Sequence, residues 1–278
     1  MLIAQQKYFL LHAPRQTGKT TCLLALAKYL NERGEYHAVY ANIETAQAAR
    51  EDVAMGMADV TWKIALAASQ QLHDERATPL AESLIATVTP TALVETFLAR
   101  WCAQLDKPLV LLLDEVDALV GDTLISLLRQ LRAGYPNRPG QFPQTVMLCG
   151  VRDIQDYRIQ SAESKAVITG GSAFNIKAKS LRLGDFNQAE VYTLLAEHTQ
   201  ETGQVFTPEA SALIWELTQG QPWLVNALAY EVTWEMKEGR DRSRPVTAEA
   251  VQQAKENLIL CRVTHLDQLA DKLREGRV

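Results

Sequence analysis

Residues 13–21, Ala-Pro-Arg-Gln-Thr-Gly-Lys-Thr-Thr, constrain the fold of this chain more than any other segment. An apolar run at 8–11 precedes them, and a helix-like segment at 22–30 follows. Strand, short loop and helix in this order direct backbone N–H groups and the positive end of a helix dipole at one anion. The pattern therefore predicts a phosphate-binding loop.

Each position of this loop has an expected part in holding a nucleotide. Gly18 allows close backbone approach, Lys19 reaches the β- and γ-phosphates, and the Thr20 hydroxyl ligates Mg²⁺. Ala13 stands where the usual pattern has glycine, and it fits the turn if its φ angle is negative. A chance Gly-Lys-Thr at a helix start is the alternative. The expected nucleotide-binding residues here are Ala13, Pro14, Arg15, Gln16, Thr17, Gly18, Lys19, Thr20 and Thr21.

A second motif is the apolar run 109–113, which follows Pro108 and ends in Asp114 and Glu115. Its unbroken apolar character indicates a strand buried on both faces. Acids after such a strand emerge at the sheet edge where ligands bind, as in a Walker B motif. We expect Asp114 to hold Mg²⁺, directly or through water, and Glu115 to orient and deprotonate the attacking water. An ordinary strand exit is the alternative, but the pairing with the loop favours an ATP site.

Strand and helix patterns alternate as far as residue 185. Helical patterns cover 45–73, 90–107 and 122–134, with a looser segment at 74–88 and Asp122 as an expected cap. Further strands are expected at 38–43, 144–150 and 181–183. This rhythm predicts an α/β fold, a three-layer P-loop NTPase core with a mostly parallel sheet, over residues 1–185.

The remainder, 186–278, has only helical patterns and is expected to form a helical domain, which in ATPases with such a site lies over the nucleotide as a lid. Its four helices are expected to start near Asn187, Thr207, Pro222 and Thr247. The first expected strand lies only a few residues after Met1, and 265–278 reads as an unfinished charged helix. We therefore expect the chain to be truncated at one or both ends.

Composition indicates a folded, soluble, intracellular protein. Of 278 residues, 47% are hydrophobic and 22% charged, so disorder is not expected. Four scattered cysteines, Cys22, Cys102, Cys149 and Cys261, lack metal or disulfide spacing, and buried reduced thiols in the cytoplasm are expected. No apolar run is long enough to cross a membrane, and no signal peptide is expected. The net charge of −5 argues against a surface coated by nucleic acid.

Four segments together resemble the AAA+ superfamily: the loop at 13–21, Leu-Leu-Asp-Glu-Val-Asp at 112–117, Cys-Gly-Val-Arg-Asp at 149–153 and Gly-Gln-Pro at 220–222. The closest branch is that of STAND-like ATPases and the bacterial and archaeal ATPases related to origin-recognition proteins. The resemblance covers nearly the whole chain. It implies a nucleotide-binding α/β core, a helical lid, and ATP with Mg²⁺.

The resemblance also assigns roles outside the two main motifs. Arg152 matches the catalytic sensor arginine that follows the fourth core strand in STAND proteins, although a surface arginine paired with a nearby aspartate is equally consistent. Pro222 matches the lid Gly-x-Pro that touches the nucleotide, although a helix stop and start explain it equally well. Origin-recognition relatives carry a lid arginine where this chain has Trp223, which favours the STAND-like branch.

Arginines also follow the second motif, where a finger acting on a neighbouring subunit would lie. They are Arg129, Arg132 and Arg138, and a solvated basic helix face is the commoner explanation.

Three functions fit these features. The leading one is a slow, Mg²⁺-dependent ATPase that uses the nucleotide to switch conformation or assembly, with homo-oligomers as a possible form and an unknown effector. The second is a nucleic-acid-associated ATPase of the origin-recognition or transposition-helper kind, for which no basic module is visible. The third is a small-molecule kinase, for which no acceptor pocket can be named.

Overall fold

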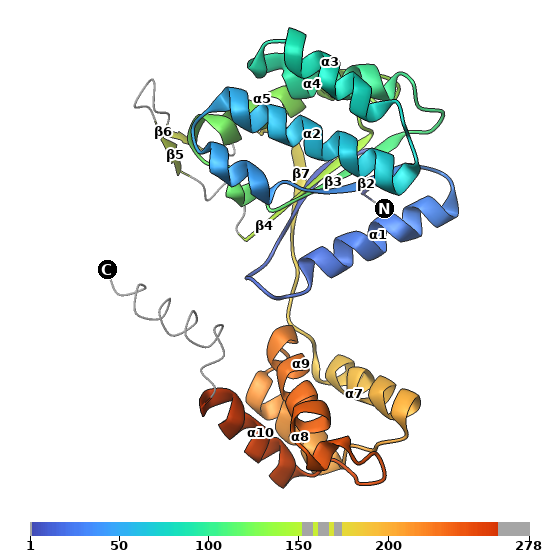
Figure 1. Ribbon diagram of the computed structural model, residues 1–278, viewed down its shortest axis with the longest axis vertical. Helices are drawn as coiled ribbons and strands as arrows, with labels where there is room; N and C mark the ends of the chain where they lie inside the picture. Colours follow the sequence, from blue (N-terminus) through green and yellow to red (C-terminus); the bar gives the residue numbers. More distant parts are fainter. Residues whose placement is uncertain (1, 152–157, 161–166, 170–173, 261–278) are drawn as a thin grey trace. The chain divides into compact units, whose positions relative to one another are not determined.

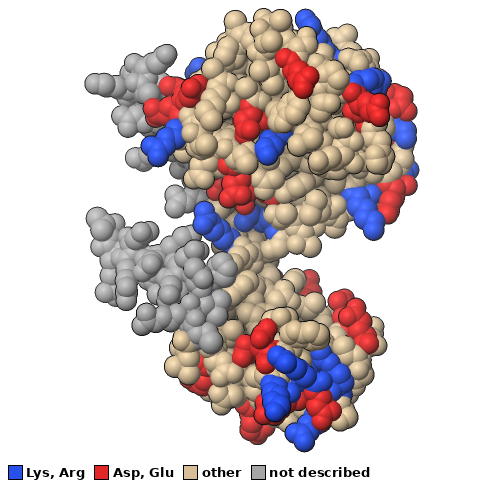
Figure 2. Space-filling model, in the orientation of Figure 1, with Lys and Arg blue, Asp and Glu red and all other residues tan. Residues whose placement is uncertain are grey.

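The computed structural model describes residues 2–151, 158–160, 167–169 and 174–260. Contacts divide the chain into two compact units, Met1–Arg15 with Lys19–Leu183, and Gln16–Gly18 with Gly184–Val278. The sequence placed this boundary two residues later. Acidic and basic side chains are interspersed over the visible face of each unit (Figure 2). Across the described residues, no helix has both the length and the apolar character that crossing a bilayer needs.

The first unit is built on five parallel strands. They are β1 Tyr8–His12, β2 His37–Asn42, β3 Leu109–Asp114, β4 Thr145–Gly150 and β7 Lys177–Arg182. Their order across the sheet is β2-β3-β4-β1-β7, and the predicted mostly parallel sheet is confirmed. The register pairs Asn42 with Asp114 and His12 with Gly150, so strand ends that carry both predicted motifs share one edge.

Helices cover both faces of this sheet, which gives the three layers that the sequence predicted (Figure 1). One face carries α1 Lys19–Arg33, and the other carries α2 Val53–Leu72, α3 Ala77–Thr87, α4 Pro90–Cys102 and α5 Gly121–Gly134. Alternate side chains of β3 enter the two cores: Leu111 and Leu113 pack with α2 to α5, and Val110 and Leu112 pack with α1.

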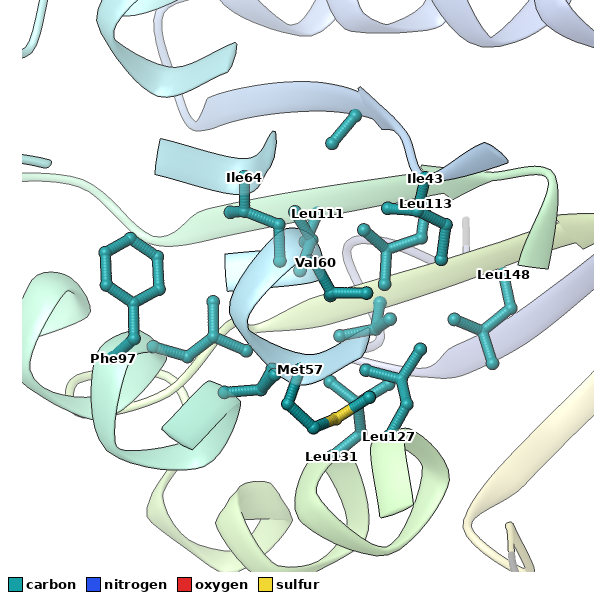
Figure 3. Packing of buried hydrophobic residues seen from close by; sticks show 14 of the residues in the cluster. Ile43, Met57, Val60, Ile64, Phe97, Leu111, Leu113, Leu127, Leu131 and Leu148 are labelled. Atoms are coloured by element: carbon teal, nitrogen blue, oxygen red, sulfur yellow. The ribbon is translucent and has the colours of Figure 1, made fainter. Parts of the chain in front are cut away.

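The larger core lies between the sheet and α2 to α5. Figure 3 shows Met57, Val60 and Ile64 of α2 beside Leu111 and Leu113 of β3, with α5 closing the cluster. Burying one such side chain contributes about 1.5 to 3 kcal/mol. This core fixes β3, and therefore the acids at its end, against the rest of the sheet.

The structure differs from the sequence prediction between residues 44 and 88. A 3₁₀ helix, Glu44–Ala49, and α2 replace one long helix, because Asp52 caps α2 by accepting from the Met55 N–H at 3.0 Å. The segment predicted to be loose contains α3. Its proline, Pro79, lies in the first turn, where the missing N–H costs no hydrogen bond.

Three smaller predictions also need correction. Asp122 does not cap α5; Val120 is the cap residue, and Asp122 lies in the first turn. Cys22 is exposed on α1, whereas Cys102 and Cys149 are buried as expected, and Cys261 lies outside the described residues. An antiparallel pair, β5 Arg158–Gln160 with β6 Val167–Thr169, was not predicted.

The second unit is helical, as the sequence predicted. It contains α7 Gln188–Thr202, α8 Pro208–Thr218, α9 Pro222–Tyr230 and α10 Ala248–Leu260, with a π-helical turn, Glu231–Glu235, after α9. Asn187 forms the predicted capping box with Glu190 at the start of α7, and the Thr207 side chain caps α8. Its core is separate from those of the first unit and is centred on Val191, Ile214, Val225 and Val251.

Candidate functional site: the loop after β1 and the acids after β3

The backbone of the loop after β1 has the conformation that an anion cradle needs. Gln16 and Gly18 have φ angles of 63° and 81°, in the left-handed region. Ala13 is fully buried, is not among the residues with positive φ, and donates its N–H to the Gly150 carbonyl at 3.3 Å. Alanine is therefore compatible with this position. A Cβ added to Gly18 would have no atom within 4 Å, so the space beside the loop is open at this residue.

Lys19 begins α1 with its side chain folded back over the loop. Its ammonium donates to the carbonyls of Ala13 and Pro14 at 3.0 and 2.9 Å, and the residue is only 6% exposed. Within the described part of the chain, neither bond is to a carboxylate, and Lys19 forms no ion pair. A buried ammonium held only by neutral carbonyls leaves positive charge available for an anionic ligand.

Two hydroxyl groups meet the buried carboxylate of Asp114. Thr20 Oγ1 donates to Asp114 Oδ2 at 2.7 Å, and the Tyr40 hydroxyl donates to the same oxygen at 3.0 Å. The other carboxylate oxygen, Oδ1, accepts from the Glu115 N–H at 3.0 Å. Burial, and next the negative charge of Asp114, raise the pKa of Tyr40 to about 12, so its phenol is protonated and acts as the donor.

The alternation of side chains along the sheet brings these groups together. On β2 and β3, Ala38, Tyr40, Val110 and Leu112 belong to the core on the α1 face. Asp114, two residues beyond Leu112, extends that row, and Thr20 lies in the first turn of α1 on the same face. The loop and the acidic strand end thus converge although 94 residues separate Thr20 from Asp114.

Glu115, the predicted base, occupies a strained backbone position next to Asp114. Its φ and ψ angles are 58° and 40°, a left-handed conformation that non-glycine residues rarely adopt and that is common at functional sites. Burial, and then the charges of Asp117 and Asp114, raise the pKa of the Glu115 carboxyl above its ordinary value. A carboxylate with raised proton affinity is suited to accept a proton from water.

Gly150 lies at the adjacent end of β4. A Cβ there would lie 2.7 Å from Asp117 Oδ1, so any larger residue would force this carboxylate to move away from the strand. Asp117 is the final acid of the 112–117 segment, and no role was predicted for it. Its position explains why glycine precedes Val151 at this strand end.

The donor set fits Mg²⁺ better than it fits a transition metal. Among the described residues, no group of three or more His, Cys, Asp and Glu side chains could hold a metal ion. Thr20 and Asp114 instead offer one hydroxyl and one carboxylate. Mg²⁺ is typically bound by one or two protein oxygens together with waters and substrate phosphates. Because the Thr20 proton points to Asp114, the lone pairs of its oxygen are available to a metal.

Pro14 takes part in this cluster through its carbonyl, which accepts from Lys19, whereas no described contact brings Arg15 or Thr21 into it. Pro14, Arg15 and Thr21 are exposed around the loop. Arg152 lies outside the described residues, so its sensor role stays a prediction. Pro222 begins α9 in the second unit, and its contact with nucleotide also stays a prediction.

Arg138 is held within its own unit, unlike a residue that reaches into a neighbour. Its guanidinium donates to the carbonyls of Gln6, Tyr135 and Gln144 and lies 3.4 Å from the Tyr135 ring centroid. These contacts give Arg138 a structural role in its own unit, and its role as a finger stays a prediction. Arg129 and Arg132 are exposed on α5.

Tyr40 is the site residue that the sequence prediction missed. A tyrosine inside the strand pattern 38–43 reads as a core side chain. Its place follows from the register of the strands: Tyr40 lies two residues before Asn42, the register partner of Asp114, and therefore on the Asp114 face, and the sequence alone does not give this register.

A family model described as an AAA-like domain matches residues 5–242. A comparison with curated protein sequences found no significant match. Among solved structures, the chain is similar to a Walker-type ATPase of Pyrococcus abyssi, with 16% identity, a TM-score of 0.61, and coverage of 96% of this chain and 72% of that protein.

Two further similar structures are Cdc6p of Pyrobaculum aerophilum and the ORC2 protein of Aeropyrum pernix. Identities are 13% and 14%, TM-scores are 0.55 and 0.54, and 90% and 92% of this chain is covered. The chain spans 60% and 64% of their lengths. At these identities the likeness shows a shared fold, that of P-loop ATPases.

Proposed function

We propose that this protein, which belongs to the AAA-like domain family, binds ATP with Mg²⁺ and hydrolyses the ATP slowly. The observation that carries the proposal is the 2.7 Å bond from Thr20 to Asp114, next to the buried ammonium of Lys19. These groups come from the two motifs that an ATP site requires, and the fold brings them together.

Each residue then has a defined part in the reaction. Lys19 and the N–H groups of the loop bind the phosphates, and Thr20 and Asp114 would hold Mg²⁺. When bound, Mg²⁺ neutralises charge on the β- and γ-phosphate oxygens. Glu115 orients a water molecule and accepts its proton as the water oxygen attacks the γ-phosphorus and the bond to the β–γ bridging oxygen breaks.

Glu115→Gln tests this assignment. The substitution keeps the shape of the side chain and removes the base, so ATP binding should persist while turnover falls by about 10² to 10⁴-fold. Glu32→Gln, at an exposed glutamate on α1, is the matched control and should leave both unchanged. A wild-type rate of ATP turnover in Glu115→Gln would refute the assignment of Glu115 as the base. Absence of ATP binding by the wild-type protein would refute the proposed function.

We also propose that the nucleotide switches conformation or assembly, as in the STAND-like ATPases. The interspersed charges on the visible face (Figure 2) and a net charge of −5 do not favour a nucleic-acid partner. Light scattering of the purified protein with ADP and with a non-hydrolysable ATP analogue tests assembly. An unchanged mass in both states would exclude an assembly switch and leave a conformational one.

A further inference from the structure

The carboxylate of Asp114 accepts a hydrogen bond from a residue that has no part in the proposed function. Thr20, Asp114 and Glu115 are assigned to metal and water, but the Tyr40 hydroxyl also bonds to Asp114 Oδ2, at 3.0 Å. Asp114 is fully buried, so its carboxylate depends on these donors rather than on bulk water. Its two oxygens are held from different sides, Oδ2 by two hydroxyls and Oδ1 by the Glu115 N–H.

The position of Tyr40 is itself fixed by a side chain of α2. Gln71 Oε1 accepts from the Tyr40 N–H at 3.0 Å, and Gln71 Nε2 donates to the Tyr40 carbonyl at 2.7 Å. β2 is an edge strand, so these two backbone groups face away from β3. The Gln71 amide therefore satisfies both groups and holds the strand residue from which the phenol reaches Asp114.

We propose that Tyr40 is a positioning residue for Mg²⁺: its hydroxyl holds the Asp114 carboxylate in the orientation that meets a metal ligated by Thr20. The inference rests on the proposed function and names a residue outside both nucleotide motifs. Without the phenol hydrogen bond, Oδ2 keeps the bond from Thr20 but loses its second hydroxyl donor, so the carboxylate gains rotational freedom. Loss of a group that orients a metal ligand typically lowers metal affinity by 10 to 100-fold.

Tyr40→Phe removes this one hydroxyl and keeps the ring. The affinity of the protein for a non-hydrolysable ATP analogue is measured by calorimetry in Mg²⁺ and in EDTA, and Mn²⁺ binding to the same complex by electron paramagnetic resonance. We expect Mn²⁺ affinity to fall by about tenfold or more. The nucleotide affinity in EDTA should stay at the wild-type value, because the loop and Lys19 are untouched.

Tyr8→Phe is the matched control. The Tyr8 hydroxyl is also buried in a strand and donates to the Pro143 carbonyl at 2.8 Å, away from Asp114. Its loss should lower the melting temperature without changing Mn²⁺ affinity. Gln71→Leu, which leaves the Tyr40 hydroxyl in place, should weaken Mn²⁺ binding in the same direction as Tyr40→Phe, but less.

The outcomes separate this inference from the proposed function. Wild-type Mn²⁺ affinity in a folded Tyr40→Phe protein would overturn the positioning role and leave the ATPase assignment intact. An equal loss of nucleotide affinity in Mg²⁺ and in EDTA would also overturn it, since a general disturbance of the site would then explain the effect. A wild-type protein that binds the analogue without any Mg²⁺ dependence would overturn both.

Discussion

Replacing Lys19 by methionine should abolish ATP binding while leaving the protein folded. Methionine keeps most of the length and the apolar stem of lysine, so the 6% exposed site is not emptied. The carbonyls of Ala13 and Pro14 lose their donor, at a cost of about 1 kcal/mol each, but a buried charge is also removed. The nucleotide-free protein should therefore melt within a few degrees of wild type.

The loss in ATP affinity can be worked from the same contacts. At 4 Å and an effective dielectric constant near 20, an ammonium and one phosphate charge attract by about 4 kcal/mol, and Lys19 is expected to meet two phosphates. To bind ATP, the wild-type Lys19 must break its bonds to the two carbonyls, which costs about 1 to 3 kcal/mol for each bond. This cost reduces the net contribution of Lys19 to ATP binding. A net loss of about 4 kcal/mol remains, which raises the Kd about a thousandfold.

Thermal unfolding and calorimetry with Mg-ATP measure this change. At an ATP concentration of about 100 times the wild-type Kd, binding stabilises the wild-type protein by about 2.7 kcal/mol. The same concentration is about a tenth of the expected Kd of Lys19→Met, so its melting temperature should not rise. Lys28→Met, at an exposed lysine paired with Glu32 on the same helix, is the control and should behave as wild type. Wild-type ATP affinity in a folded Lys19→Met protein would refute the assignment of the loop.

Three further changes test the fold and the site. Gly134→Ala should lower the free energy of unfolding by about 3 kcal/mol, because the new Cβ would lie 2.1 Å from the buried Phe142 ring, whereas Gly140→Ala, with no atom within 4 Å, should be neutral in the same urea titration. Asn187→Ala should destabilise the second unit by about 1 kcal/mol through loss of its cap, seen as a lower melting temperature; an unchanged one would contradict the capping role. Burial raises the pKa of Glu115, so the native state holds this proton more tightly than the unfolded chain, and stability falls as pH rises through the interval between the two pKa values. At pH 7, the free energy of unfolding of the nucleotide-free Glu115→Gln protein should be at least that of wild type. The difference between the two proteins should shrink as the pH is lowered, and the opposite trend would contradict the raised pKa.

The sequence predicted those elements whose residue pattern is compatible with a single kind of secondary structure. The apolar run 109–113, bounded by Pro108, indicated a strand covered on both faces, and every residue of β3 is buried. Asn187 and Glu190 satisfy each other's backbone N–H groups, so their spacing alone predicted the start of α7.

Elsewhere the pattern allowed more than one solution. The alanine-rich stretch after Ile43 is compatible with a continuous helix, and only the contact from Asp52 to the Met55 N–H shows where α2 begins. Residues 74–88 were predicted to be a looser segment, whereas they contain α3, whose first turn holds Pro79, a position that a helix tolerates. Tyr40 could not be assigned to the site because its role depends on the register between β2 and β3, which tertiary packing decides.

The sheet ends at β2 on one side and β7 on the other, the two places where a strand from another molecule could add. Beside β2, the amide of Gln71 already occupies the backbone groups of Tyr40. Along β7, Lys179 and Arg182 would bring like charges together if a second copy aligned there. Extension of the five-stranded sheet by a strand from a second molecule is therefore disfavoured at both of its edges.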